Sequence, residues 1–237
     1  MALRLIIGNK TYSSWSFRPW IAMTVADIPF EETVISLRDP AFAETVGEWS
    51  GTGKVPVLID GDFPVWESLS ILEYLAEKFP DAGLWPADPM ARAHARTVSA
   101  EMHAGFAPLR KHLPFLITRP VKPRDLTDEA AAGVTADVAR IEALWADCRA
   151  RFGAPSGAGP FLFGAFSAAD AMYAPVVARF YVYDVPVSAA TRDYMDAVMV
   201  LPAWAAWKRA ARDEPWVLDD ADHEPDWPEI LREPKHT

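Results

Sequence analysis

Two adjacent serines, Ser13 and Ser14, lie where an apolar run gives way to a helical pattern. The run Leu3–Ile7 reads as a strand, and the apolar residues after Trp20 can continue as a helix. At such a turn the first backbone N–H groups of the helix have no intrahelical partner, and together with the helix dipole they favour a nearby negative charge. An anion or a thiolate could therefore bind beside the serines. The alternative is that one serine only caps the helix.

A second polar pair, Glu67 and Ser68, opens another helix. This helix has one apolar face and stops before Pro80, with its apolar positions at Leu69, Leu72, Leu75, Ala76 and Phe79. Here the alternative to ligand binding is that Ser68 is the N-cap and Glu67 is solvated.

The elements around these pairs favour an α/β domain. A strand over 32–37 follows the first helix, and strand, helix and strand within so few residues suit a parallel βαβ unit. The segment 54–66 carries Asp60-Gly61 between two apolar runs, which predicts an antiparallel hairpin. Pro56 near the start of that hairpin cannot donate a ladder hydrogen bond, so a ligand-facing edge would suit it.

Beyond a Pro-, Gly- and Asp-rich linker at 81–89, the pattern becomes helical. We expect domains over 1–81 and 90–213 and a tail over 214–237. Ser167 and Asp170 form an acidic capping box, which predicts a buried central helix over 168–181 with a kink at Pro175. Shorter helices are expected over 191–200 and 203–212.

Composition excludes several classes of protein. The chain has 237 residues, 51% of them hydrophobic, and a formal net charge of -10. That charge argues against general binding to nucleic acid or to an anionic membrane, because such binding needs clustered Lys and Arg. The single cysteine, Cys148, excludes a disulfide within the chain and is expected to be packed rather than nucleophilic. No apolar stretch approaches the roughly 20 residues that span a bilayer, so a soluble cytoplasmic protein is expected.

The histidines indicate neither a triad nor a metal site. His94, His103 and His112 are nine residues apart, which does not place them on one helix face. We therefore expect no metal.

Four motifs in order resemble the glutathione S-transferase superfamily over nearly the whole chain. They are Tyr12-Ser13-Ser14-Trp15-Ser16-Phe17-Arg18, Lys54-Val55-Pro56-Val57-Leu58, Glu67-Ser68 with Ile71-Leu72-Glu73-Tyr74-Leu75, and Phe166-Ser167-Ala168-Ala169-Asp170. The resemblance implies a thioredoxin-like domain followed by an all-helical domain. The double serine is similar to zeta and related serine-type transferases. Those sequences usually carry a cysteine where this chain has Trp15, which argues against the zeta isomerase activity and against lines that use a catalytic cysteine.

The resemblance also implies roles for individual residues. Ser13 would donate its hydroxyl hydrogen to the glutathione sulfur, with Ser14 as second candidate. Val55, before a cis Pro56, would offer backbone groups to the cysteinyl part. The γ-glutamyl part and the glycyl carboxylate would be held by Glu67 with Ser68 and by Lys54, respectively.

A second-substrate pocket is expected near Tyr12, Trp15, His103, Phe106, Leu109 and Phe115. Core packing is the alternative role for these aromatic residues. The expected function is transfer of glutathione, the co-substrate, to small hydrophobic electrophiles by a homodimer. The alternatives are a non-catalytic binding module of the same fold and a zeta-like isomerase.

Overall fold

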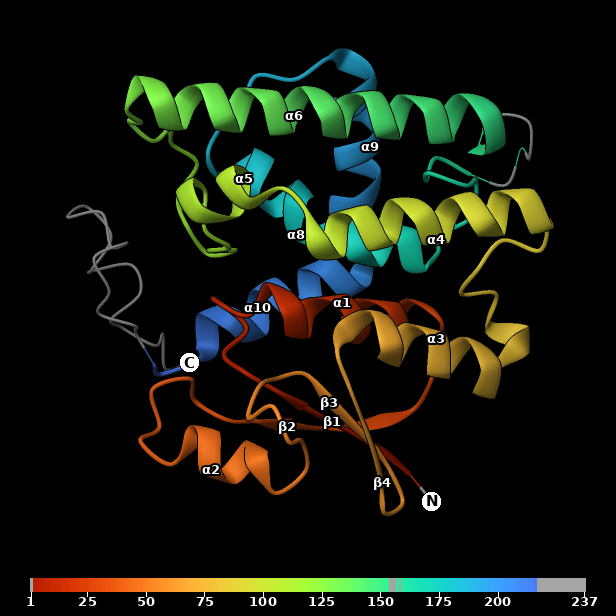
Figure 1. Cartoon of the computed structure of the whole chain (residues 1–237), viewed down its shortest axis with the longest axis vertical. Coiled ribbons are helices and arrows are strands. Elements are labelled where there is room, and N and C mark those ends of the chain that lie inside the picture. Colours follow the sequence, from red (N-terminus) through yellow and green to blue (C-terminus); the bar gives the residue numbers. More distant parts are fainter. Residues whose placement is uncertain (1, 154–156, 158, 217–237) are drawn as a thin grey trace.

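The computed structural model describes residues 2–153, 157 and 159–216, and it shows a small mixed sheet beneath a larger group of helices (Figure 1). The strands are β1 Leu3–Ile7, β2 Phe30–Val34, β3 Val57–Asp60 and β4 Phe63–Trp66. The N-terminal helices are α1 Ser14–Val25, α2 Phe42–Gly47 and α3 Ser68–Lys78, with a 3-10 turn at Pro80–Ala82. The remaining helices are α4 Pro89–Ala104, α5 Ala107–His112, α6 Asp128–Cys148, α8 Ala168–Val182, α9 Ala189–Met199 and α10 Pro202–Asp213, with a π-helical turn at Arg149–Gly153.

The sheet has the order β2-β1-β3-β4, with β1 and β2 parallel and the other neighbours antiparallel. Leu5 and Ile7 of β1 belong to the main core, whereas Ile6 packs in a smaller cluster with Val46 of α2. This alternation follows from the two-residue period of a strand, because successive side chains point to opposite faces. Both faces of the sheet are therefore covered.

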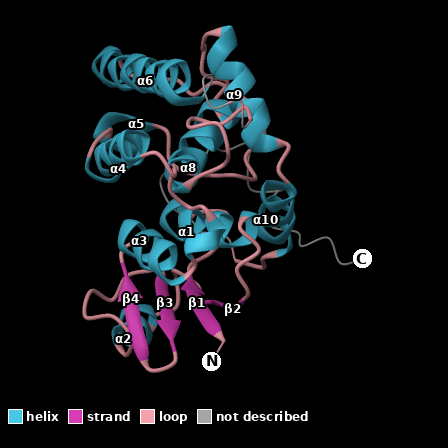
Figure 2. Ribbon diagram, turned by 90° about the vertical axis from the view of Figure 1, so that its right-hand side faces the viewer, coloured by secondary structure: helices cyan, strands magenta, loops and turns pink. Residues whose placement is uncertain are grey.

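Helix α1 lies between the sheet and the helical domain (Figure 2). Phe17, Ile21 and Met23 are completely buried. A helix covered on both sides needs apolar residues on most of its surface. The residues after Ser16 have this composition, with the buried Arg18 as an exception. Helix α1 thus places the two serines at the boundary between the domains.

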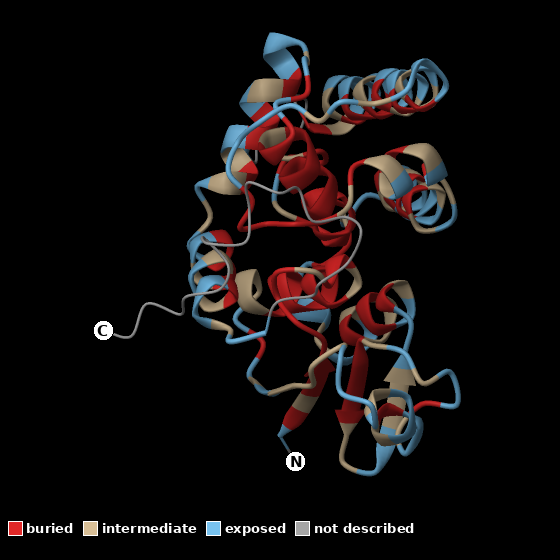
Figure 3. Cartoon of the chain, turned by 90° about the vertical axis from the view of Figure 1, so that its left-hand side faces the viewer, coloured by how far each residue is buried: buried red, intermediate tan, exposed pale blue. Residues whose placement is uncertain are grey.

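Helix α8 is the buried centre of the helical domain, as its sequence predicts (Figure 3). The predicted capping box is present: Asp170 accepts hydrogen bonds from the backbone N–H and hydroxyl of Ser167, both at 2.8 Å. Tyr194 of α9 donates a further bond to the same carboxyl at 3.1 Å. None of the described helices is long and apolar enough to cross a membrane.

Several predicted boundaries differ from the structure. Strand β2 is Phe30–Val34, not 32–37, because it pairs in register with Leu3–Ile7 of β1. The hairpin loop is Gly61-Asp62, one residue later than expected, and Gly61 takes the positive φ of 62° that this tight turn needs. The predicted tail over 214–237 lies outside the described residues from 217 onward.

Candidate functional site

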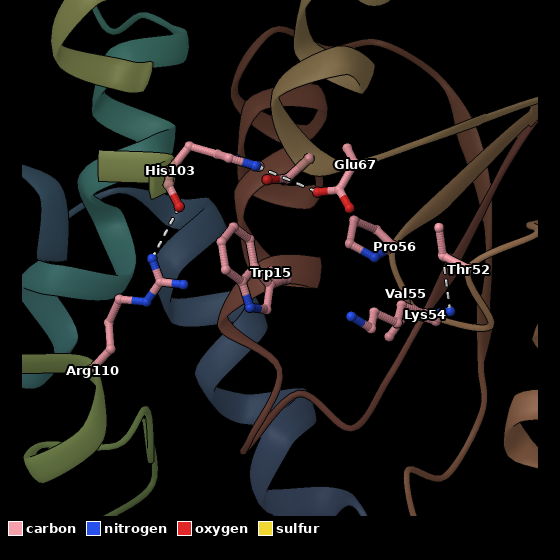
Figure 4. Close-up of a pocket in the computed structure, with 9 residues that line it drawn as sticks. Trp15, Thr52, Lys54, Val55, Pro56, Glu67, His103 and Arg110 are labelled. Atoms are coloured by element: carbon pink, nitrogen blue, oxygen red, sulfur yellow. Dashed lines mark hydrogen bonds and ion pairs between the residues drawn. The ribbon is translucent and has the colours of Figure 1, made fainter. Parts of the chain in front are cut away.

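A cavity of about 410 Å³ lies between the two domains (Figure 4). Six of its nine lining residues are polar. The nine lining residues come from the N-terminus of α1, the segment before β3, the start of α3 and helices α4 and α5. They are Trp15, Thr52, Lys54, Val55, Pro56, Glu67, Ser68, His103 and Arg110. The fold therefore brings together both later motifs predicted to bind glutathione.

Ser68 is the most informative residue of the cavity. Its side chain is completely buried, and among the described residues its hydroxyl has no hydrogen-bond partner. The sequence alternative, Ser68 as N-cap, is wrong: Glu67 is the cap residue, and Ser68 is the first residue of α3. A buried hydroxyl without a partner is costly, and it is explained if a ligand supplies the partner.

Glu67 has an unusual backbone. Its φ of 68° and ψ of 124° lie outside the regions that residues other than glycine normally occupy. Its carboxylate makes no capping bond and instead lies 3.6 Å from Nε2 of His103. Such strain costs about 1–3 kcal/mol and tends to occur at functional sites. The Glu67 conformation thus places its side chain in the cavity wall.

The Val55-Pro56 peptide bond is cis, as the resemblance implies. Lys54 is exposed, and its backbone N–H donates to the hydroxyl of Thr52 at 3.3 Å. The Lys54 side chain adds a positive charge to the edge of the cavity where the backbone of Val55 lies.

Ser13 caps α1, so the capping role considered from the sequence is confirmed. Its hydroxyl oxygen accepts from the N–H of Ser16 at 3.3 Å and donates to the Ser16 hydroxyl at 2.7 Å. The Ser14 hydroxyl has no hydrogen bond to another residue in the described part of the chain. Neither serine is among the residues that line the cavity, although Trp15, the next residue, is. For Ser13 to donate to a bound sulfur, its hydroxyl must turn away from Ser16.

Two arginines, the buried Arg18 and the half-buried Arg110, pack against Trp15, and sequence reasoning missed this arrangement. The guanidinium of Arg18 lies 4.0 Å from the centre of the Trp15 ring, and that of Arg110 lies 4.7 Å from it. Arg18 is only 1% exposed, and its Nε and Nη1 have no hydrogen-bond partner among the described residues. Burial lowers the pKa of Arg18, and the nearby charges of Arg179 and Arg110 lower it further. Arg110 lines the cavity and Arg18 does not, and together they form a cationic wall around Trp15 that favours a bound anion.

His103 completes the wall on the side of α4. Its ring packs edge-on against Trp15, with 5.2 Å between ring centres, and its Nδ1 is buried without a partner in the described chain. Burial and the charge of Arg18 lower the pKa of His103, whereas Glu67 raises it. The lowered pKa favours the neutral imidazole, and in that form its contact with Glu67 is dipolar rather than ionic.

The other residues predicted for a second-substrate pocket lie elsewhere. Phe106, Leu109 and Phe115 are buried in the main core, and Tyr12 packs against it. None of the four lines this cavity, and core packing accounts for the three buried residues. A single sequence offers no signal that separates them from Trp15, because both environments select large apolar side chains.

Comparisons with known proteins agree with this geometry. Residues 12–78 match the model of the glutathione S-transferase N-terminal domain, and residues 124–210 match that of the C-terminal domain. The chain belongs to the glutathione S-transferase family.

The sequence relatives include zeta-class proteins, in agreement with the serine motif. The chain is 36% identical over 97 residues to a probable maleylacetoacetate isomerase from Caenorhabditis elegans, covering 41% of this chain and 45% of that protein. It is 44% identical over 61 residues to a dichloromethane dehalogenase from Methylorubrum extorquens, covering 25% of this chain and 21% of that protein. Glutathione S-transferase Z1 of Arabidopsis thaliana is 26% identical over 149 residues, covering 59% and 66%. The matches thus span less than half of the first two relatives and about two thirds of the third.

Solved structures of transferases share the fold. A glutathione transferase homologue from Burkholderia, with bound glutathione, has a TM-score of 0.65 at 21% identity, covering 90% of this chain and 99% of that one. A diazinon-metabolizing glutathione S-transferase from the silkworm Bombyx mori has a TM-score of 0.69 at 18% identity, covering 89% and 97%. The thioredoxin-like and all-helical architecture expected from the sequence is confirmed.

Proposed function

We propose that the protein is a glutathione transferase that binds glutathione in the cavity between its domains. The observation that carries this proposal is the buried hydroxyl of Ser68 at the N-terminus of α3, which has no hydrogen-bond partner among the described residues. There the helix dipole and the Ser68 hydroxyl would hold the γ-glutamyl carboxylate, and the Glu67 carboxylate would hold the amine. The backbone of Val55 would bind the cysteinyl part, and Lys54 the glycyl carboxylate.

The Ser13 hydroxyl would donate to the sulfur and favour the thiolate, with Ser14 as second candidate. Lowering the pKa of a thiol from about 8.5 by about two units requires roughly 2.7 kcal/mol of preferential stabilisation of the anion. A hydroxyl donor and a helix N-terminus together supply that much. The sulfur would then attack an electrophilic carbon and form the S–C bond, while the leaving group departs with its electron pair.

The serine assignment is tested by Ser13→Ala and Ser14→Ala. Losing a hydrogen bond to a charged group costs about 1.5–3 kcal/mol, so Ser13→Ala should lower kcat/KM by roughly ten- to a hundredfold. Ser14→Ala serves as the matched control and should change it little. The ultraviolet absorbance of the bound thiolate, followed against pH, would report the thiol pKa in both variants. Equal thiol pKa values in Ser13→Ala and the parent would overturn the assignment.

The cationic wall favours a second candidate function, glutathione-dependent isomerisation of a small carboxylate with a cis double bond. The thiolate would add to the double bond, the resulting single bond would rotate, and loss of the thiolate would restore the double bond. Arg110 supports this candidate. Its Nη1 donates hydrogen bonds to the backbone carbonyls of His103 at 3.0 Å and Gly105 at 3.1 Å. Its Nε and Nη2 make no hydrogen bond to the described residues. Two relatives named as maleylacetoacetate isomerases also support it.

A comparison of charged and neutral substrates separates the two candidates. If Arg110 binds a carboxylate, the parent should turn over a cis-enone acid faster than its methyl ester, and Arg110→Gln should abolish that preference. Arg96→Gln is the control, because Arg96 lies on the exposed face of α4 and pairs with Glu73 outside the cavity. A parent that accepts acid and ester equally would refute the carboxylate role.

The non-catalytic module remains the competing proposal for the whole chain. A glutathione-affinity column separates the two proposals most simply. Retention together with conjugation of a generic electrophile supports the enzyme, whereas passage through the column without turnover supports the module.

The homodimer expected from the resemblance is also a proposal. Phe63 and Trp66 of β4 are 61% and 41% exposed, and β4 is an edge strand of the sheet, whose free edge can pair with another chain. Light scattering of the full chain would give the mass in solution. Phe63→Ser should shift a dimer toward the monomer if this edge is the interface.

A further inference from the structure

The loop between β1 and α1 is held from the far end of the chain. Both carboxylate oxygens of Glu214, which directly follows α10, accept from the backbone N–H of Lys10, at 2.8 and 2.9 Å. The Trp207 indole N–H donates to the backbone carbonyl of Lys10 at 3.0 Å, and the Thr11 hydroxyl donates to the carbonyl of Ala211 at 3.1 Å. The backbone donor and acceptor of Lys10 are thus both bound by α10 and the residue after it.

The Lys10 side chain strengthens the same attachment. The residue is only 5% exposed, and its ammonium group forms an ion pair with Glu32 of β2. The ammonium also lies 5.2 Å from the centre of the Trp207 ring and 5.5 Å from that of Trp20. A buried cation between two indole rings and a carboxylate is a rigid anchor, because each contact restricts the ammonium from a different side.

Short links connect this anchor to the serines. The carbonyl of Asn9 accepts from the N–H groups of Tyr12 at 3.1 Å and Ser13 at 2.8 Å. The Ser16 hydroxyl oxygen accepts hydrogen bonds from the backbone N–H of Gly8 at 3.1 Å and from the Ser13 hydroxyl at 2.7 Å. A shift at Lys10 therefore moves the backbone that orients the Ser13 hydroxyl.

The groups that stabilise the ionised carboxylate of Glu214 belong mainly to the β1–α1 loop. Burial raises the pKa of Glu214 to about 7. The N–H groups of Lys10 and Thr11 and the Lys10 ammonium lower it, whereas Glu32 raises it. The ionised form is thus stabilised mainly by groups of the loop itself, so the carboxylate and the loop depend on each other.

We propose that Glu214 is a positioning residue that holds the β1–α1 loop and thereby sets the place of the Ser13 hydroxyl in the glutathione site. This inference rests on the proposed function, because the hydroxyl matters only if a thiolate binds beside it. Glu214 itself touches neither the cavity nor the serines.

The test compares Glu214→Gln with Asp213→Asn in the full chain. Both variants replace a carboxyl group by an amide at neighbouring positions, but Asp213 is exposed and the structure gives it no hydrogen bond to the loop. Three quantities are measured: hydrogen exchange of the peptides covering 8–13, the pKa of the bound glutathione thiol, and kcat/KM for a generic electrophile.

Glu214→Gln should speed exchange of the Lys10 amide, raise the thiol pKa and lower kcat/KM by roughly tenfold, since a misplacement of about 1 Å can cost up to a hundredfold. Asp213→Asn should leave all three quantities at the parent values. Thermal unfolding of both variants monitors the fold, and a general loss of stability would not by itself change the thiol pKa.

The outcomes separate the two proposals. Parent-like exchange in Glu214→Gln would show that the loop is held without Glu214 and would overturn the inference. Faster exchange with an unchanged thiol pKa would also overturn it, since the loop would then not set the serine. A parent protein that fails to bind glutathione would instead refute the proposed function, and exchange would still decide whether Glu214 holds the loop.

Discussion

Replacing Ser68 by alanine should affect stability and glutathione binding in opposite directions. In the ligand-free protein the Ser68 hydroxyl is buried without a partner among the described residues, so folding removes it from water without compensation. An unsatisfied buried group costs about 1–3 kcal/mol, and alanine removes that cost while leaving only a small void. The free energy of unfolding should therefore stay the same or rise by about 1 kcal/mol.

Glutathione binding should weaken in the same variant. If the hydroxyl donates to the γ-glutamyl carboxylate, it contributes a charge-assisted bond of about 1.5–3 kcal/mol, and its loss should raise Kd by roughly ten- to a hundredfold. Denaturant unfolding without ligand and calorimetric titration with glutathione measure the two effects separately. Ser99→Ala is a matched control, because Ser99 of α4 is also completely buried, its hydroxyl has no partner within the part of the chain that the structure describes, and it does not line the cavity.

The expected pattern is that both alanine variants keep or gain stability and only Ser68→Ala loses affinity. Unchanged glutathione affinity in Ser68→Ala would refute the reasoning about the ligand. A marked loss of stability in Ser68→Ala would show that the hydroxyl already has a partner in the ligand-free protein.

Three further predictions concern stability and reactivity. Burial raises the pKa of Asp170 to about 6, above its usual value, so its favourable contribution to folding is present at low pH and is lost as the pH rises through about 6. The difference in unfolding free energy between the parent and Asp170→Asn should thus shrink between about pH 4 and about pH 6, the range between the usual and the raised pKa, and a constant difference over this range would contradict the shift. Cys148 is completely buried and its pKa is raised to about 12, so iodoacetamide should alkylate it only at the rate of unfolding, as mass spectrometry of the labelled chain would show. A Cβ at Gly105 would lie 2.8 Å from the backbone oxygen of Glu101, so Gly105→Ala should destabilise the protein by about 1–3 kcal/mol, whereas Gly47→Ala, which meets nothing within 4 Å, should not.

Much of the site was predictable, because the glutathione-binding motifs lie at the ends of strands and helices whose apolar patterns can be recognised in the sequence, and because the motifs follow one another in the order that the family shows. The strand before Ser13 and the helix after Ser68 follow from apolar periodicity alone. The cap of α3 was not predictable, because it depends on the left-handed φ of Glu67, which sequence statistics rarely assign to a glutamate. The shift of β2 has a similar origin, since strand pairing with β1 decides the register.

The sequence by itself determined the elements, their order and the family, because helix and strand periods, caps and turns are encoded locally. Only the tertiary structure showed that Arg110 joins Arg18 beside Trp15, or that Glu214 binds the backbone of Lys10. The physical reason is that such contacts join residues as many as 204 positions apart, and their partners are backbone amides and ring faces that carry no mark in the sequence. The pair of serines was visible from the start, but the packing of α10 against the loop decides where they are held.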